Sequence, residues 1–214
     1  MREIGGRLPT WEDLQVQVRW ARQHNIAVHI DGARLWHCPA YYQRSLAEIT
    51  ALADSVYVSL YKDIGGIAGA VLAGEPDFIE EARIWNRRAG GNLISLYPYI
   101  LAAEQGLAEN LSAIDKAVSY ARRLGPLLAT IPGVRTNPED PQSAMFHLHI
   151  HQAHEQVIAA TERYLQETGV LVLPKPRNAD PSYAVCEISV GRNTMAHKPE
   201  FWEKHLRACL ETLS

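Results

Sequence analysis

The sequence has 214 residues, enough for one or two domains with a buried core, and its hydrophobic and charged fractions are those of an ordinary globular protein. Its formal net charge of −3 argues against nucleic-acid binding, which needs a basic face. The longest apolar runs are too short to cross a bilayer, and the N-terminus lacks the apolar core of a secretory signal. The scattered cysteines Cys38, Cys186 and Cys209 favour reduced thiols. We therefore expect a cytoplasmic protein with neither a nucleic-acid nor a membrane partner.

Helices and short apolar strands alternate in the first half of the chain. Thr10 is placed to cap the first helix, whose first turn is acidic. The predicted elements are a helix at 11–24, a strand at 27–31, a helix at 45–52, strands at 55–60 and 67–74, and a helix at 76–90. This order predicts an α/β fold with a mainly parallel sheet. A doubly wound sheet usually has more strands, so we expect this domain to be incomplete on its N-terminal side.

The second half has a different pattern. The predicted elements are a long helical region at 95–130, a turn-rich break at 131–141, a strand at 144–151, a helix at 154–169, strands at 170–174 and 183–190, and a helix at 198–213. This succession predicts a small α+β domain. We therefore expect two domains, at 1–106 and 107–214.

The residues best suited to chemistry follow the first two predicted strands. Asp31 ends one strand and Lys62 follows the next, so both face the same rim of a parallel sheet. An amine there can hold the aldehyde of pyridoxal 5′-phosphate (PLP) as an imine, and a carboxylate can keep the pyridine nitrogen protonated. An isolated Asp-Gly is commonly a turn, however, and an isolated lysine after a strand is commonly solvated. The spacing alone leaves both interpretations open.

Four stretches of sequence carry a more specific signal. REIGGRLP, VHIDGARLW, SLYKDIGGIAGAVLAG and DFIEEARIWNRRAGG resemble the threonine aldolase/β-eliminating lyase family of PLP enzymes with the aspartate-aminotransferase fold (fold type I). By this resemblance the chain is the C-terminal portion of such an enzyme. Residues 1–106 would be part of the PLP-binding large domain, and 107–214 would be the small domain.

The resemblance also implies roles for individual residues. Lys62 would be the catalytic lysine that forms the Schiff base with PLP, and Asp31 would pair with the pyridine nitrogen. Arg34 would lie by the cofactor's 3-hydroxyl, and Ser59 would donate a hydrogen bond near its phosphate. No residue is assigned as the general base.

The activity implied by the resemblance is that of a PLP-dependent lyase. It would cleave the Cα–Cβ bond of a small β-hydroxy amino acid such as threonine, giving glycine and an aldehyde. Such enzymes assemble as homo-oligomers, either dimers or tetramers. The alternatives are β-elimination or racemisation of an amino acid on the same scaffold, or a truncated, inactive fragment that acts only in assembly.

The sequence departs from the family pattern at several positions. Asp63 follows the lysine, where the family usually has glycine, and Glu187 stands where we expect an arginine that grips the substrate carboxylate. Arg192 is the nearest substitute for that arginine. The stretch GGNLIS lacks the arginine that would reach a phosphate across a dimer. The glycine-rich phosphate loop and the residue that stacks on the PLP ring belong to the family's N-terminal portion, which this sequence does not contain.

The histidines suggest two further features. His147, His149 and His151 alternate, so they predict either a polar strand face or a zinc site, and no nearby Cys or carboxylate pattern completes the latter. We expect no metal. His37 and Cys38, shortly after Arg34, lie either near a site or in the core, and we expect them to serve packing.

Overall fold

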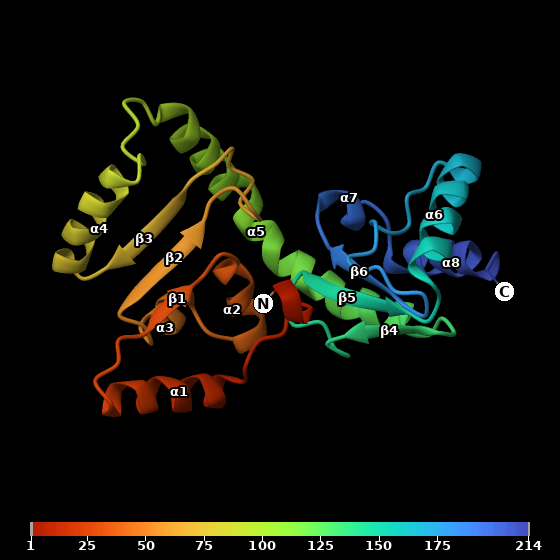
Figure 1. Cartoon of the computed structure of the whole chain (residues 1–214), viewed down its shortest axis with the longest axis horizontal. Coiled ribbons are helices and arrows are strands. Elements are labelled where there is room, and N and C mark those ends of the chain that lie inside the picture. Colours follow the sequence, from red (N-terminus) through yellow and green to blue (C-terminus); the bar gives the residue numbers. More distant parts are fainter. Residues whose placement is uncertain (1, 214) are drawn as a thin grey trace. The chain divides into compact units, whose positions relative to one another are not determined.

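The computed structural model describes residues 2–213, which divide into two compact units (Figure 1). One unit comprises residues 9–115, and the other comprises residues 2–8 together with 116–213. The helix α5, Tyr97–Leu128, contributes to both units because the division falls within it. The predicted domain boundary after residue 106 lies in the same helix.

The unit 9–115 is built on a three-stranded sheet with the order β1-β2-β3. Its strands are β1 His29–Asp31, β2 Ser55–Ser59 and β3 Ala70–Gly74. The pair β1–β2 is parallel, as predicted, whereas β2–β3 is antiparallel. The prediction of a mainly parallel sheet is therefore wrong for β3. A parallel return needs a crossover of about a dozen residues or more, usually with a helix, and the short loop after β2 contains none.

The helices of this unit follow the sequence signals closely. They are α1 Trp11–Gln23, η2 Leu35–His37, α2 Cys38–Tyr42, α3 Leu46–Thr50, α4 Pro76–Arg88 and the first part of α5. Thr10 caps α1 by accepting a hydrogen bond from the Asp13 amide at 3.1 Å, as predicted. Ser45 and Glu48 form a capping box on α3. The short helix α2, with a proline in its first turn, was not predicted.

The other unit contains a second three-stranded sheet, with the order β4-β5-β6 and antiparallel pairing throughout. Its strands are β4 Val134–Asn137, β5 Met145–Ile150 and β6 Ala184–Ser189. Its helices are η1 Arg2–Ile4, the second part of α5, α6 His154–Thr168, α7 Arg192–Met195 and α8 Pro199–Glu211. The unit buries Phe146 and Leu148 of β5 completely, together with Val157 of α6.

Two predictions in this unit are wrong. The break predicted at 131–141 contains β4, a strand too short to show a clear alternation between Gly133 and Pro138. The segment 170–174, predicted as a strand, forms none. Its apolar residues differ in burial, since Leu173 is 3% exposed and Leu171 is 57% exposed, and an apolar run by itself does not establish strand pairing. No helix among residues 2–213 is long and apolar enough to span a membrane.

Candidate active site

The carboxyl ends of β1 and β2 form one edge of the first sheet. The two strands run parallel, and β1 ends at Asp31 opposite Tyr57, two residues before the end of β2, so both strands point toward the same edge. Asp31 is the last residue of β1, and Lys62 lies in the loop just after β2. The Gly32 amide donates to the Tyr57 carbonyl at 2.8 Å and extends the pairing past Asp31. The segments that carry the predicted acid and amine therefore leave the sheet at the same edge.

Asp31 is exposed at this edge. Its Oδ1 accepts a hydrogen bond from the Ala33 amide at 3.3 Å, which shapes the turn after the strand. Its other carboxylate oxygen has no hydrogen bond or ion pair within residues 2–213. The carboxylate is therefore able to accept a further N–H donor.

Lys62 lies in a tight turn. The Gly65 amide donates to the Lys62 carbonyl at 3.0 Å, and the Gly66 amide donates to the Leu60 carbonyl at 2.8 Å. Gly65 has φ +81°, a backbone conformation that residues other than glycine rarely adopt. The Lys62 amine lies 5.5 Å from the centre of the Tyr61 ring and forms no ion pair among the described residues. The amine is therefore not held by a carboxylate, and it can react with an aldehyde without first breaking an ion pair.

Ser59 is fully buried at the end of β2. Its Oγ is 2.9 Å from the hydroxyl of Tyr57, and the two share a hydrogen bond. If the Tyr57 hydroxyl donates in this bond, the Ser59 hydroxyl keeps its own proton for another acceptor, such as a phosphate oxygen. Tyr57 was not among the sequence candidates, although its place two residues before Ser59 puts both side chains on one face of the strand.

Asp63, the residue after Lys62 in the sequence, contacts two basic side chains. Its Oδ1 is 3.2 Å from Nε2 of His37, and its Oδ2 is 3.8 Å from Nε of Arg34. Burial opposes ionisation of Asp63, but the hydrogen bond from His37 and the charges of His37 and Arg34 hold the pKa of Asp63 below its ordinary value. In the sequence, Asp63 stands out only as a departure from the family pattern, and packing is the expected role of His37, with a place near a site as the alternative. Their contact is tertiary, so no local pattern could reveal it.

Cys38, next to His37, is not a candidate nucleophile. Burial raises the pKa of its thiol to about 11, so the thiolate is scarce at neutral pH.

Glu187 lies in the other unit, within a cluster of charges. Its Oε2 accepts from Nε of Arg2 at 2.8 Å and lies 3.4 Å from Nη1 of Arg177. Arg177 also donates to both carboxylate oxygens of Glu3 and to Nε2 of His147. Glu187 therefore serves to join the N-terminal segment to β6. Arg192, the proposed substitute for the missing arginine, begins α7.

His147 and His149 lie on one face of β5 with their ring centres 6.4 Å apart, as the alternation predicts, whereas His151 lies beyond the end of the strand. This face is polar but largely covered, because His147 is only 4% exposed and is hydrogen-bonded to Arg177. Within residues 2–213, no group of three or more His, Cys, Asp or Glu side chains is arranged to hold a metal ion.

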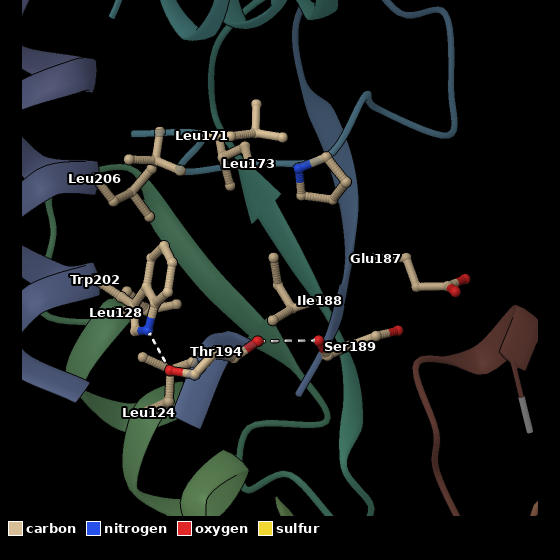
Figure 2. A pocket seen from close by; sticks show the side chains of 12 residues that line it. Leu124, Leu128, Leu171, Leu173, Glu187, Ile188, Ser189, Thr194, Trp202 and Leu206 are labelled. Atoms are coloured by element: carbon tan, nitrogen blue, oxygen red, sulfur yellow. Dashed lines mark hydrogen bonds between the residues drawn. The ribbon is translucent and has the colours of Figure 1, made fainter. Parts of the chain in front are cut away.

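The same unit has a cavity of about 380 Å³, shown in Figure 2. Its wall is mostly apolar and comes from α5, β6, α8 and the segment 171–174. Trp202 Nε1 donates to the Thr194 carbonyl at 2.9 Å at one side of it. The charged side chain among its lining residues is the carboxylate of Glu187, and no lysine or arginine lines it, so the cavity offers no cation for the phosphate of a cofactor.

The edge of the first sheet fits the functional groups of PLP. It offers an amine without an ion pair, a carboxylate with an accepting oxygen and a nearby guanidinium, on loops that a turn-forming glycine keeps close to the sheet. An α/β unit with this combination at parallel strand ends offers the groups that a PLP-binding protein needs. The chain belongs to the beta-eliminating lyase family, whose model matches residues 1–151. Membership confirms PLP as the predicted cofactor.

Three comparisons describe the relatives. The chain is 28% identical to low-specificity L-threonine aldolase 1 of Arabidopsis thaliana over 169 residues, covering 79% of the chain and 47% of the relative. It is 32% identical to alanine racemase TOXG of Cochliobolus carbonum over 106 residues, which cover 50% of the chain and 27% of that relative. A crystal structure of a provisionally assigned L-allo-threonine aldolase from Listeria monocytogenes EGD-E is 42% identical, with a TM-score of 0.92 over 99% of this chain and 59% of that one. The chain spans about half the length of the first curated relatives it matches.

Proposed function

We propose that the protein is a PLP-dependent lyase that cleaves the Cα–Cβ bond of a β-hydroxy amino acid, giving glycine and an aldehyde. The observation that carries the proposal is the shared edge of β1 and β2, where Asp31 and the uncommitted Lys62 leave parallel strands. The relatives named as threonine aldolases support this reaction above others. When bound, PLP supplies an electron-accepting ring for the bond cleavage.

The chain's own residues would prepare that chemistry. The Lys62 amine would bond the cofactor covalently, and the Asp31 carboxylate would hold a proton on the pyridine nitrogen by its opposite charge. Arg34 would place a guanidinium by the 3-hydroxyl. Ser59, hydrogen-bonded to Tyr57, is the proposed hydroxyl on the phosphate side.

The proposal extends to the organisation of the protein. Residues 1–106 would form part of the PLP-binding large domain, and 107–214 would form the small domain of a fold-type-I enzyme. The enzyme would work in the cytoplasm on a small amino acid as a homo-oligomer.

Replacement of Lys62 tests the proposal directly. We expect Lys62→Ala to lose both the visible absorbance of lysine-linked PLP and the adduct that borohydride fixes to the chain, because no other side chain is proposed to form this bond. Lys116→Ala, at an exposed position of α5, is the matched control and should keep both signals. A fixed adduct of undiminished yield in Lys62→Ala would overturn the lysine assignment. Failure of the unmodified chain to bind PLP would support the inactive-fragment alternative.

A second candidate is racemisation or β-elimination on the same scaffold. The relative named as an alanine racemase favours it, and Glu187 in place of an expected arginine is compatible with a changed substrate. The products decide between the reactions. Threonine should yield glycine and acetaldehyde under the first proposal, whereas elimination from serine yields pyruvate and ammonia, and racemisation of alanine only removes optical activity.

A further inference from the structure

We propose that Asp63 is a positioning residue that ties the Lys62 loop to the segment carrying Arg34 and His37, and that its negative charge favours the protonated form of the lysine-linked cofactor. The inference deepens the proposed function and rests on it, because it concerns the surroundings of the same lysine. Asp63 has no part in the bond-breaking itself.

The contacts of Asp63 are divided between its two oxygens. Oδ1 is bonded to His37, whose side chain is 2% exposed and therefore fixed in position. Oδ2 is 3.8 Å from the Arg34 guanidinium, is buried and has no hydrogen bond among the described residues. A buried carboxylate oxygen without a hydrogen bond is unfavourable unless nearby positive charge compensates for it.

The backbone around Asp63 is held from a second side. Ile64 is fully buried, and its carbonyl accepts from Nδ2 of Asn110 on α5 at 2.7 Å. The loop is thus anchored to α5 through Ile64 and to η2 through the Asp63 side chain. Loss of the Asp63 contact would leave Lys62 attached to a loop that is fixed on one side only.

The charge of Asp63 matters because its neighbours are basic. Arg34 alone would disfavour a second positive charge nearby, including that of a protonated imine on Lys62. The pKa of Asp63 lies below its ordinary value, so the group is ionised at neutral pH and offsets the charge of Arg34. Removal of this one carboxylate should therefore lower the proton affinity of the imine.

Spectra of the PLP-loaded protein test the charge. Asp63→Asn keeps the shape and removes the charge, so the ratio of the protonated, visible band to the deprotonated, near-ultraviolet band should fall several-fold at a fixed pH near the imine's pKa. Asp63→Glu, which restores the charge, should recover most of the ratio. Asp77→Asn on α4 removes the same charge from an exposed position and should leave the ratio unchanged.

The second measurement needs no cofactor. A carboxylate can only accept, so Nε2 of His37 carries the proton in their hydrogen bond. The NMR signal of this ring N–H should be observable in the unmodified chain. In Asp63→Ala it should disappear, because the unprotected proton exchanges with water.

The two parts of the proposal have separate decisive outcomes. An unchanged N–H signal in Asp63→Ala would overturn the tether, which is the attachment of the Lys62 loop to His37 through Asp63. An unchanged band ratio in Asp63→Asn would overturn the charge effect. If Asp63→Asn does not fold, Asp63→Ala, which also removes the charge, takes its place in the spectra: a fallen ratio supports the charge effect, and an unchanged one overturns it. Absence of any bound PLP in the unmodified chain would count against the proposed function, while the NMR measurement would still decide the tether.

Discussion

At the scale of single residues, Arg177 determines the state of a buried histidine. Its Nη1 lies 2.8 Å from Nε2 of His147, and because a guanidinium can only donate, Nε2 must be the unprotonated, accepting nitrogen. Burial and, next, the charge of Arg177 lower the pKa of His147. The folded protein therefore holds this imidazole neutral, although a neighbouring carboxylate, Glu187, acts in the opposite direction.

This arrangement predicts a pH-dependent stability. The folded-state pKa of His147 lies below the unfolded value of about 6.5, so the unfolded chain binds more protons between the two values. The contribution of His147 is complete above about pH 6.5 and is lost as the pH falls through the folded-state pKa. We expect the free energy of unfolding in urea to fall with pH in this window, and to fall less in His147→Gln.

A second histidine provides the control for that experiment. His151 is exposed, and His151→Gln should keep the full pH dependence of the unmodified chain. Equal slopes of unfolding free energy against pH in the unmodified chain and in His147→Gln would show that His147 has no part in it.

At the scale of elements, α5 packs directly on the loop that follows β2. A Cβ added at Gly106 would lie 2.2 Å from the carbonyl oxygen of Ile64, which is closer than atoms can approach. This glycine therefore lets the helix lie against the turn two residues after Lys62.

Gly106→Ala should accordingly destabilise the protein. Alanine gains about 1 kcal/mol over glycine in a helix, but overpacking against a backbone atom typically costs about 1–3 kcal/mol and displaces the Lys62 loop. Because the clash is with a backbone atom at 2.2 Å, we place the cost in the upper part of that range, about 2–3 kcal/mol. The expected net loss of unfolding free energy is then about 1–2 kcal/mol, with weaker retention of PLP. Gly191→Ala adds a Cβ that meets nothing within 4 Å and is the control. A Gly106→Ala protein as stable as the unmodified chain would contradict the close packing.

The elements that sequence could predict are those with local signals. Thr10 before α1 and the proline that begins α4 mark helix starts, because capping and proline geometry act within one turn. The antiparallel direction of β3 and the pairing of β4 depend on partners elsewhere in the chain, so local patterns failed there.

The candidate site likewise contains residues that the sequence could place and contacts that it could not. Asp31 and Lys62 could be placed at one edge from their positions after two strands. The contact of Asp63 with His37 joins positions 26 residues apart and depends on how η2 packs, which the sequence does not encode locally.

At the scale of the whole molecule, the unit 9–115 exposes much apolar surface. All five residues of β3 are exposed, and α4 has no buried residue. Val71 on β3 is 47% exposed and Trp85 on α4 is 59% exposed. β3 also pairs with only one strand among the described residues, so its outer edge presents unpaired backbone groups. Apolar side chains beside an unpaired strand edge form a surface that favours association.

We therefore expect the 214-residue chain to associate with further copies of itself through β3. Sedimentation should show an average mass that rises with protein concentration. Val71→Lys should lower that mass, because a charged side chain on an edge strand disfavours pairing with another strand. Val16→Lys replaces a comparably exposed apolar residue on α1 and should leave the mass unchanged. A monomeric mass at every concentration would show that the exposed edge does not drive association, whereas equal loss of mass in both variants would indicate a general effect of added charge.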